Sequence, residues 1–315
     1  MKVAALAGGV GGAKLVDGIS RLYGAPEMTV IVNTGDDFSL FGLWISPDLD
    51  TVCYNLAGLE NQATGWGRDQ ESWETFQEIQ ALGGPDWFQL GGKDLATHLE
   101  RTRRLGAGQP LSQITADFCK AWGVQSAVIP MSDDPVPTLV ETDQGILTFQ
   151  EYFVKLGCEP EVKGFEFHNV EKSRPAPGVL DAIQAADLVL ICPSNPWVSI
   201  DPILAVPGIR SALGSKTVLG VSPIICGEAV KGPAAKMYRE MGIQPSAGAV
   251  AAHYGDLLDG FVIDDLDRDL QEDILSAWNG SLTLFHTNIW MKTRADRVAV
   301  AENIIAVGSS LVKEV

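Results

Sequence analysis

Short runs of apolar residues recur along the chain, and longer segments with helical alternation of apolar and polar residues separate them. Six runs have the length of strands: Val3–Ala7, Met28–Val32, Ser126–Pro130, Asp187–Cys192, Thr217–Val221 and Gly260–Ile263. Runs without polar alternation are typical of strands buried on both faces of a parallel sheet. Amphipathic segments such as 179–186 and 232–241 lie between them. The pattern predicts an α/β fold with a doubly wound, mostly parallel sheet.

Two regions depart from this rhythm. Residues 61–113 are rich in tryptophan, glycine and charge, with helical periodicity and no strand pattern. Residues 138–170 contain two β-like runs, ILTFQEYFV and EVKGFEFHNV, which we expect to pair as a hairpin. We interpret both regions as insertions that form a lobe over the sheet. The core would then comprise residues 1–60 and 114–315, with the hairpin inserted in the second part.

The composition excludes several classes of partner. The 315 residues include 23 Lys and Arg against 40 Asp and Glu, a formal net charge of −17. This charge repels phosphate backbones and acidic lipid surfaces, and no basic stripe offsets it. No stretch reaches the roughly 18 apolar residues of a membrane span, and no basic leader precedes the first apolar run. We therefore expect a cytoplasmic protein that binds neither nucleic acid nor membranes.

The cysteines and histidines do not form a metal-binding pattern. The cysteines are odd in number, widely spaced and without a CxxC motif, so we expect reduced core residues. They are Cys53, Cys119, Cys158, Cys192 and Cys226. The four histidines lie far apart, and only His98 belongs to a dense polar cluster, GGKDLATH. The sequence contains no GxSxG motif, so nothing in it indicates a serine nucleophile.

The strongest chemical signal is the run GGVGGAK, which lies between the first predicted strand and a predicted helix. Glycines there let the backbone approach phosphate oxygens, and a helix N-terminus offers free N–H groups and a positive dipole end. The run is not a P-loop, because Ala13 stands where that motif requires Gly and Leu15 where it requires Ser or Thr. It also matches the dinucleotide-binding motif GxGxxG only in part, because Lys14 replaces the third glycine. We expect a nucleotide or diphosphate here. The alternative is that the glycines serve only strand-to-helix packing.

Two acidic motifs, NTGDD and SPDLDT, follow the second predicted strand. Because the carboxyl ends of parallel strands face the ligand crevice, we expect Asp36, Asp37, Asp48 and Asp50 to converge there. Carboxylates in close proximity repel one another unless a cation lies among them, and Mg²⁺ is the expected cation beside a diphosphate. The alternative assigns each aspartate to a helix cap or a turn.

Loops after two later predicted strands, CPSNP and VSPIICGEAVKGPA, add polar groups at the same edge. We expect Asn195 and Ser222 to bind a base or ribose, and 227–232 a phosphate, with Lys231 as a point charge. Turn geometry alone is the alternative for their prolines and glycines. Three further acidic residues are expected to be solvated surface charges, and the alternative is that they read a guanine edge: Asp264, Asp265 and Asp267.

Together these motifs resemble those of the 2-phospho-L-lactate transferases of coenzyme F(420) biosynthesis, including bacterial members with a phosphoenolpyruvate-derived donor. The matching strings, from Met1 to about Asp265, are GGVGGAK, NTGDD, SPDLDTVCYNLAG, GWGRDQESW, PDWFQLGGKDLATH, AGQPLSQIT, PMSDDPVPT, FQEYFV, PSNPWVSIDPIL, PGIR and SPIICGEAVKGPA. The resemblance implies a Rossmann-like fold, a homodimer and Mg²⁺-dependent transfer. The implied acceptor is the deazaflavin alcohol Fo, and the donor is a guanosine diphosphate ester of phospholactate or phosphoenolpyruvate (LPPG or EPPG). The implied products are (dehydro) F(420)-0 and GMP.

The motifs and the resemblance together assign candidate residues. The expected donor-binding residues are Gly8, Gly9, Gly11, Gly12, Lys14, Ser194, Asn195, Ser222, Gly227, Lys231 and Gly232. The expected Fo-binding residues, covered by the insertion 61–113, are Asp50, Thr51, Trp87, Lys93, Asp94 and His98. The candidate metal ligands are Asp36, Asp37 and Asp48, and the candidates to orient or deprotonate the hydroxyl are Asp36, Asp48 and Asp50. Gly92 and Lys93 replace the family's usual acid and Arg, and Lys keeps the charge without the bidentate geometry.

Two other functions stay open. A related group with the same core consists of non-catalytic proteins that bind nucleotide sugars in cell-envelope regulation. An NAD-dependent oxidoreductase is also an alternative, because Asp36 lies roughly 25 residues after the glycine run, near the spacing of an acid that binds ribose. The broken GxGxxG is evidence against this second alternative. Lactate, enolpyruvate and glycerate donors are all compatible with the transferase.

Overall fold

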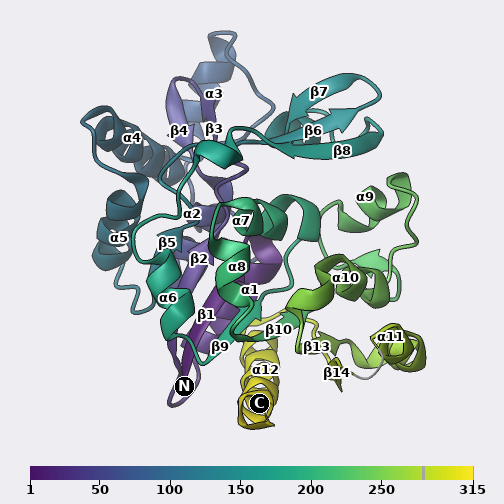
Figure 1. The fold of residues 1–315 in the computed structure, drawn as a ribbon. Helices are drawn as coiled ribbons and strands as arrows, with labels where there is room; N and C mark the ends of the chain where they lie inside the picture. Colours follow the sequence, from purple (N-terminus) through teal and green to yellow (C-terminus); the bar gives the residue numbers. More distant parts are fainter. Residues whose placement is uncertain (279–280, 315) are drawn as a thin grey trace.

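The central sheet has seven parallel strands in the order β14-β13-β10-β9-β1-β2-β5 (Figure 1). It is seen in a computed structural model that describes residues 1–278 and 281–314. The strands are β1 (Lys2–Ala7), β2 (Glu27–Val32), β5 (Ala127–Pro130), β9 (Leu188–Ile191), β10 (Thr217–Val221), β13 (Gly260–Ile263) and β14 (Thr283–His286). The chain builds outward from β1 and then from β9, so the strand order reverses between these two. The doubly wound, Rossmann-like α/β fold is confirmed.

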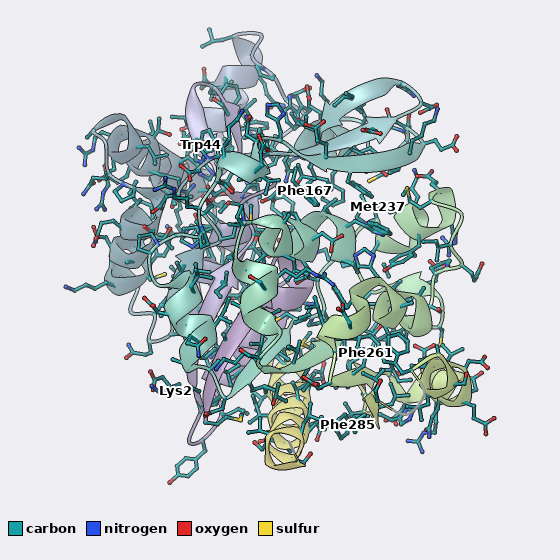
Figure 2. The ribbon with its side chains drawn as sticks, in the orientation of Figure 1. Lys2, Trp44, Phe167, Met237, Phe261 and Phe285 are labelled. Carbon is teal, nitrogen blue, oxygen red and sulfur yellow. The ribbon has the colours of Figure 1, made fainter. Side chains whose placement is uncertain are left out.

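Helices cover both faces of the sheet and bury alternate residues of its strands. Val3, Ala5 and Ala7 of β1 pack in a core with one group of helices: α1 (Gly9–Ser20), α2 (Pro47–Ala57), α5 (Leu111–Ala121) and α12 (Arg294–Glu314). Ala4 and Leu6 pack with the second group: α6 (Val179–Ala185), α7 (Asp201–Ala205), α8 (Ile209–Leu213) and α10 (Ala247–Tyr254). Phe261 of β13 lies in this second core (Figure 2). Within 1–278 and 281–314, no helix has the length and apolar character needed to cross a membrane.

A lobe lies over the carboxyl ends of the strands, at the top of Figure 1. It contains the hairpin of β3 (Phe38–Leu40) and β4 (Leu43–Ile45), the helices α3 (Glu74–Ala81) and α4 (Gly92–Gly106), and an antiparallel sheet ordered β7-β6-β8. The strands of that sheet are β6 (Thr138–Thr142), β7 (Gly145–Thr148) and β8 (Val162–Phe167). The remaining elements are β11 (Ile224–Ile225), β12 (Glu228–Ala229), α9 (Ala234–Glu240) and α11 (Gln271–Ala277).

The predicted hairpin is wrong in its pairing. The runs 146–154 and 161–170 do not pair with each other, because β7 and β8 lie on opposite sides of β6. The end of the first run turns into a short helix, Glu151–Lys155. The sequence TLVET supplies the central strand, and it did not stand out as an apolar run because only two of its five residues are apolar. Two segments that are distant in the sequence therefore meet through a strand that the pattern did not reveal.

Two cysteines differ from the expected core placement. All five are free, and Cys53, Cys119 and Cys192 are buried. Cys226 is exposed and Cys158 is only partly buried. Both have positive φ angles, 61° at Cys158 and 50° at Cys226, which place them at surface turns. The expectation of a core residue is therefore wrong for Cys226 and only partly met by Cys158.

The expected surface position is also wrong for two acidic residues. Asp264 and Asp267 are buried, whereas Asp265 is exposed as expected. Asp264 accepts hydrogen bonds from the backbone N–H groups of Leu266 and Ile289, at 3.0 and 2.9 Å. Asp267 accepts from the backbone N–H of Cys226. These carboxylates fix loops at the end of β13 and β10, so their burial is compensated by backbone donors.

Candidate active site

A cleft of about 640 Å³ opens at the carboxyl ends of the strands and is closed from above by the lobe. It lies where the strand order reverses, between β1 and β9, which is the usual ligand site of an open α/β sheet. Most of the predicted site residues line it: Gly8, Gly9, Gly11, Lys14, Asp36, Asp48, Asp50, Thr51, Trp87, Asp94, His98, Ser194, Asn195, Ser222, Lys231 and Gly232. The structure therefore brings most residues of the predicted donor site and of the predicted acceptor site into one cavity.

Gly12 and Gly227, expected to bind the donor, lie outside the cleft lining. A Cβ atom at Gly12 would lie 2.6 Å from the Ser194 hydroxyl and 3.1 Å from the Ala7 side chain, so this glycine is needed for packing. Gly227 has a φ of +77°, which a turn between β11 and β12 requires. Gly12 therefore serves helix packing and Gly227 serves a turn, which are the alternative roles considered for the glycines of these loops.

Asp37 and Lys93 also lie outside the lining. Asp37 accepts hydrogen bonds from Trp44 Nε1 at 3.0 Å and from Ser46 Oγ at 2.7 Å, so it links the β3–β4 hairpin to the start of α2. Lys93 is exposed, and its Nζ donates to the Asp69 carbonyl at 2.9 Å. On α4, one residue of displacement rotates a side chain by about 100°. Of these two neighbouring residues, both expected in the acceptor site, Asp94 lines the cleft and Lys93 does not.

The donor half of the cleft is built around the N-terminus of α1. Only Gly8 separates β1 from α1, so the remaining glycines belong to the helix itself. A Cβ atom at Gly11 would lie 2.1 Å from the Pro193 carbonyl oxygen. The Ser194 hydroxyl accepts from the Gly8 N–H at 3.1 Å and donates to the Gly8 carbonyl at 2.7 Å. The segments after β1 and β9 are thus in direct contact, and Gly9, Val10 and Gly11 at the start of α1 line the cleft.

Two lysines supply positive charge at this half. Lys14 Nζ donates to the Met291 carbonyl at 2.8 Å, and Lys231 Nζ donates to the Thr64 carbonyl. Burial lowers the pKa of Lys14, and the charges of Arg297 and Lys231 lower it further. The chain as a whole is acidic, so these cations and the helix N-terminus form a local positive region suited to an anion.

Asp36 and Asp48 line the cleft beside this positive region. Asp48 Oδ2 accepts from Asn33 Nδ2 at 2.9 Å and from Ser199 Oγ at 3.5 Å. Asp36 Oδ2 accepts from Gln150 Nε2 at 3.1 Å, whereas its Oδ1 is buried without a partner among the described residues. Burial raises the pKa of Asp48 to about 6 and that of Asp36 well above its ordinary value, the latter with the charge of Asp48 adding to the effect.

The predicted trio Asp36, Asp37 and Asp48 does not form a compact ligand cluster. In the described part of the chain, the one group of three whose ligand atoms lie within 4.8 Å of one another is Asp50, Asp94 and His98. Arg101 already lies within that group, with its guanidinium on Asp50. A cation there would face a buried positive charge, so Asp36 and Asp48 are the better pair for a metal ion.

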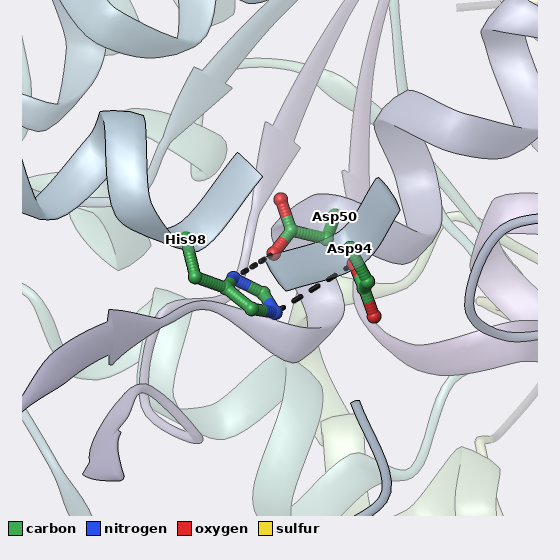
Figure 3. A group of neighbouring side chains, drawn as sticks. All are labelled: Asp50, Asp94 and His98. Carbon is green, nitrogen blue, oxygen red and sulfur yellow. Dashed lines mark ion pairs between the residues drawn. The ribbon is translucent and has the colours of Figure 1, made fainter. Parts of the chain in front are cut away.

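The acceptor half is organised by one face of α4 and the first turns of α2 (Figure 3). Asp50 accepts from both terminal nitrogens of Arg101, with Nη1 at 3.0 Å from Oδ2. His98 Nδ1 lies 3.2 Å from Arg101 Nη1, and Nε2 lies 3.6 Å from Asp94 Oδ1. Asp94 Oδ1 also accepts from the Tyr54 hydroxyl at 2.7 Å. Asp94, His98 and Arg101 share a helix face because they follow one another at i, i+4 and i+7.

Burial sets the charges of this group. It raises the pKa of Asp94 to about 7, and the charge of Asp50 acts in the same direction. It lowers the pKa of His98 to about 4, against the opposing effect of Asp50. At pH 7 the imidazole is therefore neutral, and Asp94 titrates close to the working pH.

Aromatic side chains form the walls of the acceptor half. Trp87 and Phe88 line the cleft and pack against Phe38, with ring centroids 5.8 and 4.9 Å from the Phe38 ring. Phe149 and Phe153 line it from the lobe and are stacked, with centroids 5.4 Å apart and planes 6° apart. Flat apolar faces of this kind suit a planar ring system.

Several residues of the site were not predicted individually. Arg101 pairs with Asp50, Tyr54 with Asp94, Asn33 with Asp48 and Gln150 with Asp36. Asn33 and Tyr54 belong to motifs that were singled out. Arg101 could have been found from helical spacing, since it follows Asp94 by seven residues. Gln150 comes from a segment that was interpreted as part of a strand.

Comparisons with known proteins agree with this geometry. Residues 3–289 match the family model of the 2-phospho-L-lactate transferase CofD. A phosphoenolpyruvate transferase of Streptomyces griseus subsp. griseus is 46% identical over 285 residues, covering 88% of this chain and 90% of the relative. A phosphoenolpyruvate transferase of Thermobifida fusca is 46% identical over 283 residues, covering 85% and 88%.

Among solved structures, a UPF0052 family protein of Bacillus halodurans shares the fold, with a TM-score of 0.64 and 18% identity. The match covers 96% of this chain and 98% of that protein. At this identity the likeness concerns the fold alone. The family match and the relatives extend over most of the chain, including both halves of the cleft. The chain therefore belongs to the 2-phospho-L-lactate transferase CofD family.

Proposed function

We propose that this chain transfers a phosphoenolpyruvyl or phospholactyl group from a guanosine diphosphate ester to the ribityl hydroxyl of the deazaflavin Fo. The products are (dehydro) coenzyme F(420)-0 and GMP. Membership of the CofD family and the names of the relatives support a transferase of coenzyme F(420) biosynthesis, and the relatives favour the phosphoenolpyruvyl donor. The observation that carries the proposal is the continuity of one cleft from the N-terminus of α1 to the aromatic walls.

In this proposal the donor diphosphate binds at the N-terminus of α1. The amides of the first helical turn donate to its oxygens, and Lys14 and Lys231 balance its charge. The deazaflavin ring lies between the aromatic walls, with its ribityl chain directed toward Asp50. This arrangement aligns a hydroxyl with the phosphorus that carries the organic acid.

The reaction is then an in-line substitution at that phosphorus. A bond forms between the ribityl oxygen and phosphorus, the bond from phosphorus to the bridging oxygen breaks, and GMP leaves. The hydroxyl proton passes to a carboxylate of the cleft. The protein contributes positioning and charge neutralisation, and no covalent intermediate with a side chain is required.

We further propose that Mg²⁺ assists the transfer. Asp36 and Asp48 fit such an ion, since both line the cleft next to the donor half and the buried Asp36 Oδ1 has no hydrogen-bond partner within 1–278 and 281–314. Mg²⁺ typically takes one or two carboxylates together with phosphate oxygens and water, and when bound it would neutralise charge on the diphosphate. The resemblance to the family also leads us to expect a cytoplasmic homodimer.

Incubation of the protein with Fo, Mg²⁺ and the lactyl, enolpyruvyl or glyceryl guanosine diphosphate ester tests the proposal. Mass spectrometry of the deazaflavin should show the added phosphoester with the enolpyruvyl donor, together with GMP, and chelation of Mg²⁺ should suppress it. Absence of product with every donor would refute the transferase. Tight binding of nucleotide sugars without any change in Fo fluorescence would instead favour the regulatory protein.

The Asp50→Asn variant tests the acceptor side separately. It keeps the shape of the side chain and removes the charge that pairs with Arg101. We expect slower turnover and weaker binding of Fo, with unchanged affinity for the donor. Full turnover with unchanged Fo affinity would remove Asp50 from the mechanism.

A further inference from the structure

His98 carries a buried polar atom that the protein itself leaves without a partner. The residue is 1% exposed and lines the cleft, and its Nε2 makes no hydrogen bond to the described residues. A buried donor or acceptor without a partner costs about 1–3 kcal/mol, so such atoms call for an explanation. A ligand atom in the cleft would supply the missing bond.

The neighbours of His98 determine which hydrogen its ring carries. Arg101 has only donors, and its Nη1 lies 3.2 Å from Nδ1. The nearest Asp50 oxygen lies 3.6 Å from Nδ1, too far for a good hydrogen bond, so we assign Nδ1 as the acceptor. The guanidinium is fixed in this position by its two bonds to Asp50. In a neutral imidazole the hydrogen is then on Nε2, which points toward Asp94 (Figure 3). His98 therefore carries a buried donor that has no partner among the described residues and points toward Asp94.

Asp94 presents an acceptor next to this donor. Its Oδ1 accepts from the Tyr54 hydroxyl, and no donor in residues 1–278 and 281–314 lies on Oδ2. The 3.6 Å between His98 Nε2 and Asp94 Oδ1 is too long for a good hydrogen bond. One oxygen atom can lie within hydrogen-bond distance of both groups.

We infer that His98 and Asp94 together bind one hydroxyl group of the ribityl chain of the acceptor. His98 Nε2–H donates to the hydroxyl oxygen, and the hydroxyl donates to Asp94. A hydroxyl group, like a water molecule, both accepts and donates through one atom. A phosphate or carbonyl oxygen would face the carboxylates of Asp94 and Asp50, and a cation would face Arg101 and the Nε2 hydrogen. The inference rests on the proposed function and specifies which part of Fo these residues recognise.

Fluorescence titrations with two ligands test this assignment. One ligand is Fo, and the other is the same deazaflavin ring without its ribityl chain. We expect His98→Phe and Asp94→Asn each to weaken Fo binding roughly tenfold and to leave the binding of the bare ring unchanged. His168→Phe is the matched control, because His168 is exposed and lies outside the cleft lining.

The outcomes separate this assignment from the proposed function. If the wild type binds Fo and the variants weaken Fo and the bare ring equally, or weaken neither, the assignment is wrong and the transferase proposal stands. If the wild type binds no Fo, both are wrong. A loss confined to the ligand with the ribityl chain supports the assignment.

A second measurement is made on the wild type and uses a variant only to assign signals. The ¹⁵N NMR spectrum of histidine-labelled protein contains four imidazoles, and the His98 signals are identified by their loss in His98→Phe. We expect the neutral form with hydrogen on Nε2 at pH 7 and a shift of Nε2 on addition of Fo. Hydrogen on Nδ1, or an Nε2 shift caused by Mg²⁺ alone, would overturn the assignment.

Discussion

At the scale of single residues, the pair of Asp50 and Arg101 fixes the geometry of the acceptor half. Both side chains are almost completely buried, and the carboxylate receives two hydrogen bonds from one guanidinium. Two buried charges are tolerated when they are paired, whereas removal of one leaves the other without compensation. The same guanidinium orients His98. This one ion pair therefore controls both stability and the hydrogen-bonding pattern of the cleft.

Replacement of Arg101 should be costly. We expect Arg101→Met to lower the free energy of unfolding by about 3–5 kcal/mol, because Asp50 is left buried and unpaired. Urea denaturation measures this change. Arg103→Met is the control on the same helix, since the Arg103–Glu100 pair is exposed and its loss should leave stability unchanged. Equal stabilities of the two variants would show that the Asp50–Arg101 pair is not a structural anchor.

The residues that were predicted share one property, namely that their place follows from local sequence. Asp36 and Ser194 come directly after buried strands, so their position at the carboxyl edge of the sheet could be inferred. Lys93 lies outside the cleft lining, because the face that α4 turns toward the cleft depends on where the helix begins. Arg101 was missed because its partner, Asp50, is on another helix and 51 residues away.

At the scale of elements, helix α1 is held against the loop after β9 with no space between them. The Pro193 carbonyl oxygen occupies the position at which a Cβ atom on residue 11 would lie. Any side chain at Gly11 would push the helix N-terminus away from the loop and would change the direction of its amides. The close contact of these two segments thus serves the fold and the proposed diphosphate site together.

A glycine-to-alanine pair tests this contact. We expect Gly11→Ala to destabilise the protein by about 1–3 kcal/mol and to weaken the binding of GDP, because backbone atoms must shift. Gly106→Ala is the control: it lies at the end of α4, with no atom within 4 Å of the added carbon, and it should be neutral or slightly stabilising. Calorimetric unfolding and GDP titration measure both effects. Equal behaviour of the two variants would contradict the packing argument.

The elements differ in how far the sequence predicts them. The six strands buried on both faces gave continuous apolar runs, and all are present in the sheet. Strand β14 was missed because all four of its residues are only partly buried, so its sequence carries no uniform apolar run. Strand β6 was missed because only two of its five residues are apolar, and its pairing with partners on both sides is a feature of tertiary structure alone.

At the scale of the whole molecule, the cleft collects carboxylates in a chain that is already acidic. Burial raises the pKa values of Asp36, Asp48 and Asp94, which line the cleft, and that of Asp37, which lies outside its lining. The fold holds them together although their ionised forms repel one another and are poorly solvated. Such a site favours protons or a bound cation, and the free protein should therefore respond strongly to pH.

Asp94 allows this response to be isolated. Its pKa is about 7 in the folded protein against an ordinary value of 3.8, so the folded state holds the proton more tightly than the unfolded state. The stabilisation that this provides is complete below about pH 4 and is lost as the pH rises through about 7. Asn cannot ionise, and it still offers an oxygen to Tyr54. We therefore expect the melting temperature of Asp94→Asn, relative to the wild type, to increase between pH 5 and pH 8.

Asp265→Asn, which removes one exposed charge, serves as the control and should show a constant difference. A constant difference for Asp94→Asn as well would mean that Asp94 is ionised across this range and that its burial is fully compensated.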